Sequence, residues 1–420
     1  MQKTLLIIGF VWPEPNSSAA GSRMMQLISC FKSEGYHITF ASACVKTENA
    51  FDLKPLGIEQ VTIELNDSSF DNFIIKLQPE IVLFDRFMTE EQYGWRISEN
   101  SPNTLRILDT EDLHCLRKAR QQAFKDEKPF DYSYLFNDVA KREIASIYRC
   151  DLSLIISEAE IDFLTQVFKV SDSLLYYLPF LLEPISETEI SELPKFNNRE
   201  HFVSVGNFLH PPNYQSVLYL KETVWPLIKK ELPTTELHIY GAYASQKVTQ
   251  LDNKKEGFVI KGYAEDISEI MQDAKVCLAP LQFGAGLKGK LIDAMQNGTP
   301  CVISSIAAEG MFGDFEPNGF ITDEVNDFVN SAVALYSNEA IWDDTHKKGF
   351  DIINTRFQFA GFQKQFIQLV TDLKSILKTH RLDNFTGQML QHHTLQSTKF
   401  MSKWIEAVSY THLTLPTIQL

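Results

Sequence analysis

Apolar and polar positions alternate in blocks over the first half of the chain. Residues 5–10 form a continuous apolar run, which is typical of a strand buried on both faces. A stretch rich in Pro, Ser and Gly follows over residues 13–22, and apolar residues then recur at helical spacing up to Phe31. Gly35 stands where a helix C-cap is expected, and residues 37–42 form the next apolar run. The pattern predicts a strand, a loop, a helix and a second strand in succession.

The same alternation continues through the first domain. Segments with charged helical faces lie between several further strand-like runs, at residues 61–65, 81–84, 105–108 and 152–156. Strands that alternate with helices indicate a parallel, doubly wound sheet.

A second set of strands and helices follows an irregular stretch. Residues 174–194 mix apolar, Pro and acidic residues without a steady period, and we expect the domain linker there. Further strands are predicted at residues 201–205, 237–240, 257–261, 276–280 and 300–304. We therefore predict an α/β protein of two Rossmann-like, doubly wound parallel-sheet domains, residues 1–182 and 200–356. Their facing strand ends would form a ligand-binding cleft.

The end of the chain has a different pattern. An amphipathic helix is predicted from residue 357 to about 377, within a segment, 357–380, that could cross back to the N-terminal domain. Residues 381–420 are polar and patternless and are expected to be a tail. The last thirteen, VSYTHLTLPTIQL (408–420), resemble a translated sequencing-adapter artefact and are left out of the fold prediction.

Composition narrows the class of protein. The 420 residues include 44% apolar and 22% charged residues, as in an ordinary globular protein, and the formal net charge of −15 argues against a nucleic-acid partner. The six cysteines form no C-x-x-C pair and are interpreted as small buried hydrophobes in a reducing compartment. No signal peptide is visible, and the apolar run at 174–182 is about half a membrane span. We expect a cytoplasmic protein, with peripheral contact at the inner face of the cell membrane left open.

A glycine loop carries the main chemical signal. Residues 284–290, GAGLKGK, nearly match a phosphate-binding P-loop, but Leu291 stands where that loop needs a hydroxyl to hold Mg²⁺. The loop joins a predicted strand to a predicted helix, where backbone amides and lysines 288 and 290 suit a diphosphate. Asp293, one turn into that helix, could accept hydrogen bonds from ribose hydroxyls. The alternative is a plain strand-to-helix turn with solvated lysines.

Several segments together resemble a known group, the retaining GT-B glycosyltransferases of the family 4 (glycosyltransferase group 1) type. The matching segments lie between residues 4 and 378: PEPNSSAAGSRMMQLISCFKSEGYHITFAS (13–42), LDTEDLH (108–114), VSVGNFLHPPN (203–213), WPLIKKELPTTELHIYG (225–241) and IKGYAEDISEIMQDAKVCLAPLQFGAGLKGKLIDAMQNGTPCVISSIAAEGM (260–311). The resemblance implies a GT-B fold whose second domain holds the nucleotide-sugar donor.

The resemblance also implies donor-site residues. The family signature is an acid, seven residues and a Glu, and Asp293 takes the second position while Ala285 leaves the first without a carboxylate. Glu309 is a candidate second carboxylate, or instead a loop acid that caps the helix from Met311. Because no Lys or Arg stands between Gly206 and Lys221, the lysines of the glycine loop would neutralise the diphosphate. Other expected donor contacts are Gly206, Asn207, Tyr263, Gly284, Gly286, Lys288 and Lys290.

Each of these has a structural alternative. Gly206 and Asn207 could form an ordinary turn, and Tyr263, expected to stack on the base, could be a surface tyrosine. In the first domain the loop with Gly21 and Arg23 is expected to face the donor phosphates or the acceptor, although Arg23 could simply cap its own helix.

His114 is expected near the sugar, with a solvated histidine beside acids as the alternative. The spacing of Asp109 and Asp112 does not fit a D-x-D metal site, and the family generally works without metal, so neither a metal nor a cofactor is expected. Arg117, Lys118 and Arg120 form a basic cluster that in this family sometimes faces anionic lipid, but such a run is more often a solvated face.

The implied function is sugar transfer, with retention, from a nucleoside diphosphate sugar to a hydroxyl of a carbohydrate or lipid-linked acceptor in polysaccharide or glycolipid assembly. His114, Lys288 and Asp293 are the expected catalytic residues. Two alternatives remain: a sugar-nucleotide epimerase of the same fold, and a degenerate, non-enzymatic binding or partner module, which the missing acid at Ala285 would suit.

Overall fold

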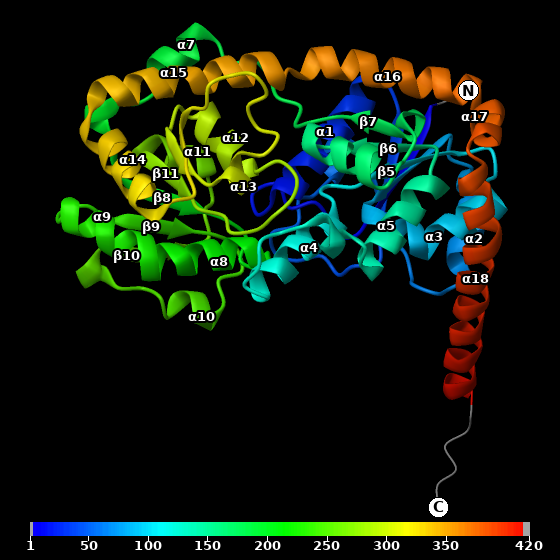
Figure 1. Cartoon of the computed structure of the whole chain (residues 1–420). Helices are drawn as coiled ribbons and strands as arrows, with labels where there is room; N and C mark the ends of the chain where they lie inside the picture. The colour runs from blue at the N-terminus through cyan, green and yellow to red at the C-terminus, as the bar shows by residue number, and fades with distance from the viewer. Residues whose placement is uncertain (1–2, 415–420) are drawn as a thin grey trace, which may run out of the picture.

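The computed structural model describes residues 3–414 and contains two parallel-sheet α/β domains joined side by side (Figure 1). The first sheet has seven strands in the order β3-β2-β1-β4-β5-β6-β7. Their bounds are β1 (Thr4–Gly9), β2 (His37–Ser42), β3 (Glu59–Thr62), β4 (Ile81–Asp85), β5 (Leu105–Asp109), β6 (Leu152–Ile155) and β7 (Leu175–Tyr177). The helices of this domain are α1 (Ala19–Ser33), α2 (Ser69–Leu77), α3 (Arg86–Asn100), α4 (His114–Lys125), α5 (Asp138–Arg149) and α6 (Glu158–Asp162).

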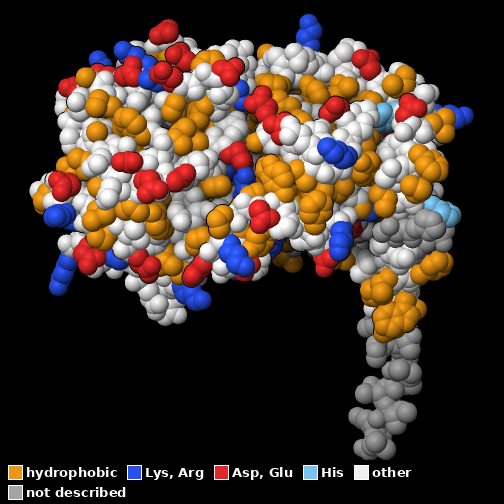
Figure 2. All heavy atoms as spheres, in the orientation of Figure 1, with side chains coloured by type: hydrophobic (Ala, Val, Ile, Leu, Met, Phe, Trp, Pro, Cys, Tyr) orange, Lys and Arg blue, Asp and Glu red, His pale blue; other side chains and the backbone are white. Residues whose placement is uncertain are grey.

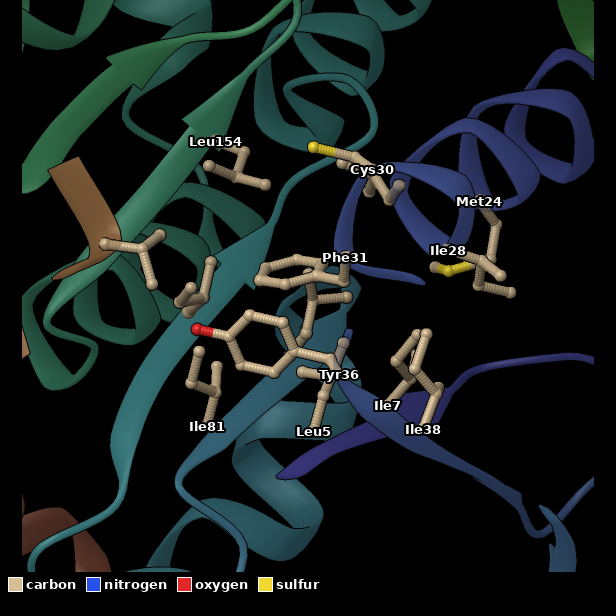
Figure 3. Packing of buried hydrophobic residues seen from close by; sticks show 14 of the residues in the cluster. Leu5, Ile7, Met24, Ile28, Cys30, Phe31, Tyr36, Ile38, Ile81 and Leu154 are labelled. Carbon is tan, nitrogen blue, oxygen red and sulfur yellow. The ribbon is translucent and has the colours of Figure 1, made fainter. Parts of the chain in front are cut away.

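Alternation along β1 divides the first core into two layers. Leu5 and Ile7 pack with apolar residues of α1, while Leu6 and Ile8 face α2 to α5 on the other side of the sheet. Figure 3 shows the first layer, in which the Phe31 ring lies edge-on to Tyr36 with 5.2 Å between centroids. The continuous apolar run of β1 is therefore explained by burial on both faces, as predicted.

The second sheet has six strands in the order β10-β9-β8-β11-β12-β13. Their bounds are β8 (Glu200–Val205), β9 (Leu237–Tyr240), β10 (Phe258–Gly262), β11 (Ala274–Ala279), β12 (Cys301–Ile303) and β13 (Gly319–Ile321). Its helices are α8 (Pro211–Tyr219), α9 (Trp225–Glu231), α10 (Gln246–Thr249), α11 (Ile267–Asp273), α12 (Gly289–Gln296), α13 (Ser305–Ala308), α14 (Val325–Ser337) and α15 (Glu339–Arg356).

The strand order reverses once in each sheet, beside β1 in the first and beside β8 in the second. Ligands bind at such switch points, outside the carboxyl ends of the strands. The segment between the domains differs from the expected linker at 174–194: Leu175–Tyr177 forms edge strand β7, and α7 (Glu187–Glu192) follows. The short run was missed because an edge strand of three residues carries no readable period.

The chain crosses back to the first domain after α15. Helix α16 (Phe359–Ser375) places Phe366 and Val370 in the same core layer as β1 and α1. Helices α17 (Leu377–Asp383) and α18 (Phe385–Thr414) follow, and α18 lies along α3 and α5.

The prediction of a patternless tail from residue 381 was wrong, because residues 385–414 are helical. Polar contacts hold this end: Arg381 pairs with Asp151, and Glu406 pairs with Arg96. Several apolar residues of α18 are exposed, among them Phe400 and Trp404. Figure 2 shows hydrophobic side chains on the surface near this end of the chain. Of the suspected artefact at 408–420, residues 415–420 lie outside the described residues.

Two further sequence features are seen. All six cysteines are free, and five of them are buried. Within residues 3–414, none of the helices combines the length and the apolar character needed to cross a bilayer.

Candidate functional site

A cavity of about 1010 Å³ lies between the two domains, at the carboxyl ends of β1, β4, β8 and β11. Most of the predicted site residues line it: Gly21, His114, Gly206, Asn207, Tyr263, Gly284, Lys288, Lys290 and Asp293. Arg23, Gly286 and Glu309 do not.

Asp293 lies in the second turn of α12 and is half-buried. Its side chain makes no hydrogen bond to another described residue, so both oxygens are available to a ligand. Burial raises the pKa of this carboxyl to about 7, against the opposing charge of Lys290. The group therefore gains most from partners that donate hydrogen bonds, such as hydroxyls.

Lys290 belongs to a small polar network at the end of β8. Its Nζ donates to Asn213 Oδ1 at 2.9 Å, and Asn213 Nδ2 donates to Asn207 O at 2.9 Å. A Cβ on Gly206 would lie 2.5 Å from Asn213 Cγ, so any larger residue there would displace the Asn213 side chain. Burial lowers the pKa of Lys290 to about 8. Sequence reasoning missed Asn213, whose only signal is its place in the first turn of α8, after two prolines.

Lys288 is arranged differently from the expectation. It precedes α12, and its Nζ donates to the carbonyls of Ala285 and Gly286 in its own loop. Burial lowers its pKa to about 8. Its ammonium faces loop carbonyls, so binding a phosphate would require the side chain to turn.

Two glycines of the loop, Gly286 and Gly289, lie against the first domain. Gly286 has φ +66°, and a Cβ there would lie 2.8 Å from Asp112 Cβ. A Cβ on Gly289 would lie 2.7 Å from Ala19 Cβ. The amide of Gly286 donates to Glu160 Oε1 at 2.8 Å, so it is not free for a phosphate. Close approach of the two domains therefore requires these glycines.

Arg120 fastens the same loop to α4. Its Nη1 donates to Gly284 O at 2.9 Å and to Glu309 Oε2 at 2.8 Å, and its Nη2 donates to Glu309 Oε1 at 2.6 Å. Burial alone would raise the pKa of Glu309, but the hydrogen bonds and charge of Arg120 outweigh it and lower the pKa.

Two predictions about this region are therefore wrong. Glu309 neither lines the cavity nor caps Met311, and Arg120 is an interdomain residue instead of part of a lipid-facing or solvated patch. Only Lys118 of the basic cluster is exposed, because Arg117 pairs with Asp112. The sequence could not show the pair of Arg120 with Glu309, because these two residues are 189 positions apart.

Two further residues explain the loop's position. Glu160, buried on α6, accepts from the amides of Leu113 and Gly286, and burial raises its pKa to about 8. Ala285, at the position where the expected signature has its first acid, packs with apolar residues of the first domain. An acid there would enter an apolar contact.

Arg23 neither faces the cavity nor caps its own helix, so both expectations for it were wrong. Its side chain is 1% exposed and pairs with Asp109 at 2.9 Å, and its Nη1 donates to the carbonyls of Leu178 and Pro179. Ser18, not Arg23, caps α1. Arg23 therefore joins α1 to β5 and to the segment after β7.

His114 begins α4 at the edge of the cavity. Its Nδ1 lies 3.1 Å from Asp112 O and 3.5 Å from Glu143 Oε1. These oxygens favour a proton on Nδ1, which leaves Nε2 as an acceptor in the neutral ring.

Loops of the two domains meet over the cavity. Tyr243 donates through its hydroxyl to Glu14, and Asn207 Nδ2 donates to Ser17 O at 3.2 Å. Tyr263 lines the cavity with a partly exposed ring. In the part of the chain that the structure describes, no group of three or more His, Cys, Asp or Glu side chains could hold a metal ion.

Comparisons with known proteins agree with this architecture. Residues 199–338 match the family model "Glycosyl transferases group 1". An uncharacterized 44.6 kDa protein in the cps region of Klebsiella pneumoniae is 25% identical over 241 residues, which cover 54% of this chain and 59% of that protein. The chain thus spans less than two thirds of this relative.

Solved structures share the fold at low identity. Sucrose-phosphate synthase from Thermosynechococcus elongatus has a TM-score of 0.66 at 15% identity, covering 89% of this chain and 99% of that one. TarM of S. aureus has a TM-score of 0.67 at 13% identity, covering 88% of this chain and 99% of that one. Anabaena HepE in complex with UDP and glucose has a TM-score of 0.64 at 14% identity, covering 88% of this chain and 100% of that one. The chain has the GT-B fold, as predicted. The match to the group 1 glycosyltransferase model covers residues 199–338 of the second domain, and membership of family 4 stays a prediction.

Proposed function

We propose that this chain is a retaining glycosyltransferase that moves a sugar from a nucleoside diphosphate sugar to a hydroxyl acceptor. The observation that carries the proposal is the placement of Asp293 and Lys290 on α12. Both face the interdomain cavity, inside the segment that matches the group 1 family.

The chemistry follows from these positions. Asp293 would accept hydrogen bonds from the ribose hydroxyls. Lys290 and the amides at the start of α12 would hold the diphosphate and stabilise the negative charge that develops on it as the sugar leaves. This positive charge would make a metal ion unnecessary. His114 would contact the sugar from the first domain, and Tyr263 would stack on the base.

The comparisons support the substrate class and the setting. The similar fold of HepE holds UDP and glucose, and TarM has been seen with UDP and a glycan. The K. pneumoniae relative from a cps region supports a role in polysaccharide assembly. We place the chain in the cytoplasm, with peripheral contact at the inner membrane face where the acceptor is lipid-linked.

The test is turnover. The protein is incubated with UDP-, GDP- and ADP-glucose and a mixture of methyl glycosides, and release of nucleoside diphosphate and the anomeric configuration of the product are followed by NMR. We expect release with one nucleotide and a product that keeps the donor's configuration, with strong loss in Asp293→Ala and Lys290→Ala. Lys118→Ala, an exposed lysine outside the cavity, is the control. A protein that binds nucleotide but releases none with any donor would be a binding module, and an epimerised donor would indicate the epimerase.

A further inference from the structure

An acidic cluster at the first-domain end of the cavity has no role in the site described so far. Asp85 ends β4, and Glu111 follows β5 by two residues; both line the cavity, as does Arg86. Asp85 and Asp109 are direct neighbours in the sheet, so the cluster sits where two parallel strands end together.

Two carboxylate oxygens in this cluster are buried without a partner. Asp85 is 4% exposed: its Oδ2 accepts from the amide of Phe10 at 2.9 Å and from Arg86 at 3.4 Å, but Oδ1 accepts from nothing. Glu111 is 9% exposed, its side chain accepts no hydrogen bond from a described residue, and its Oε1 is fully buried. A buried acceptor without a partner destabilises the fold, so it is kept only where something else is gained.

The backbone is strained at the same place. Glu111 has φ +63° and sits at the centre of a turn in which Asp112 N donates to Thr110 O at 2.8 Å, a three-residue turn that is rare at positive φ. Arg86, at the start of α3, has φ +69°. Neither residue is a glycine, and strain of this kind collects at ligand sites.

The charges favour a neutral ligand with hydrogen-bond donors. Arg23 pairs with Asp109 and Arg86 pairs with Asp85, and no ion pair joins Glu111 to another described residue. Burial and the neighbouring Asp109 and Asp85 raise the pKa of Glu111 well above its usual range. Hydroxyls satisfy such oxygens without bringing charge. The Phe10 ring, half-exposed beneath the Arg86 guanidinium at 5.3 Å, adds an apolar face.

We propose that Asp85, Arg86 and Glu111 form a subsite that binds the hydroxyl groups of a sugar. The unpaired oxygens of Asp85 and Glu111 accept hydrogen bonds from neighbouring hydroxyls, the guanidinium donates to a sugar oxygen, and the Phe10 ring covers the C–H face. The inference rests on the proposed function for the rest of the cavity. The sugar belongs either to the donor or to a saccharide acceptor, and the experiment separates the two.

The test uses Asp85→Asn and Glu111→Gln, which keep the side-chain shape, with Glu64→Gln, an exposed glutamate outside the cavity, as control. Calorimetry measures the affinity of each protein for UDP, GDP and ADP, for their glucose conjugates, and for methyl glycosides with and without nucleotide. If the donor sugar occupies the subsite, the variants lose about tenfold affinity for the conjugate and none for the nucleotide. If an acceptor does, they lose about tenfold affinity for a methyl glycoside alone.

Stability separates this role from a structural one. Because the Glu111 side chain makes no hydrogen bond to a described residue, Glu111→Gln is expected to leave Tm unchanged or raise it while sugar affinity falls. The inference is overturned if neither variant changes the affinity for any sugar, if the wild type binds no sugar in either form, or if affinity falls only together with Tm. A wild type that binds a glycoside but no nucleotide would refute the proposed function and leave this subsite standing.

Discussion

Asp293 and Lys290 lie one turn apart on α12, and burial moves their pKa values toward each other, to about 7 and about 8. As the pH falls through about 7, Asp293 takes up a proton and its hydrogen bonds to hydroxyls weaken, because charged acceptors bind about twice as strongly as neutral ones. As the pH rises through about 8, Lys290 loses its charge and its hold on a diphosphate.

The affinity for a nucleoside diphosphate sugar should therefore be highest between about pH 7 and about pH 8, falling about tenfold on each side. Calorimetric titrations across this range measure it. Lys290→Arg keeps its charge and should lose the alkaline limb, since Lys288 is turned to its own loop. An affinity independent of pH in the wild type would refute the assigned roles of both residues.

For individual residues, the sequence could predict the position of those that stand at the ends of strands and helices. Lys290, Asp293 and Gly206 could be placed because a strand-to-helix loop positions them without distant partners. Arg23 and Glu309 could not, since burial and partners 86 and 189 residues away decide their orientation.

At the scale of structural elements, the glycine loop before α12 brings the two domains into close contact. Gly286→Ala would put a Cβ 2.8 Å from Asp112 Cβ and would also strain the backbone at φ +66°. We expect both sheets to fold but the cleft to open, with at least a tenfold loss of nucleotide affinity. Small-angle scattering measures the opening and calorimetry measures the affinity.

Gly361→Ala is the matched control, because a Cβ there meets nothing within 4 Å. It should leave both quantities unchanged. If Gly286→Ala bound nucleotide as the wild type does, the close interdomain contact of the loop would not be needed for binding.

Helix α18 packs on α3 and α5, and none of its described residues lines the cavity. Ending the chain after Asp383 keeps Arg381 on Asp151 but removes Glu406 from Arg96. We expect Tm to fall by about 5 °C with unchanged nucleotide affinity. A changed affinity would mean that α18 acts on the cleft.

Elements with a clear hydrophobic period could be predicted from the sequence. The interdomain contacts of the glycine loop and the helix α18 could not. The loop reads as a phosphate motif because its glycines are visible, while their contacts with the first domain are not. Helix α18 shows no apolar stripe toward the core, since ion pairs and backbone contacts hold it and several of its apolar residues face outward.

At the scale of the whole molecule, Arg120 is one of the residues that join the two domains. Its pair with Glu309 is mostly buried, so Arg120→Met should cost about 2 kcal/mol of unfolding free energy by leaving Glu309 and Gly284 O unpaired. The double variant with Glu309→Met should recover part of this loss. Denaturant unfolding of the four proteins gives the coupling energy, and additive effects would show that the pair does not act as a unit.

Two tandem parallel sheets and a cleft between them could be predicted from alternating patterns alone. The closed contacts across the cleft could not, because each joins residues from different domains that no local pattern relates. Tyr243 with Glu14, and Glu160 with Gly286, are of this kind.

The central claim is that the cleft binds a nucleoside diphosphate sugar through α12. The most direct measurement is the calorimetric titration of the wild type, Asp293→Ala and Lys118→Ala with UDP-, GDP- and ADP-glucose. The account predicts that one nucleotide sugar binds the wild type and Lys118→Ala equally and binds Asp293→Ala at least tenfold more weakly. Equal binding to all three proteins, or no binding to a folded wild type, would contradict it.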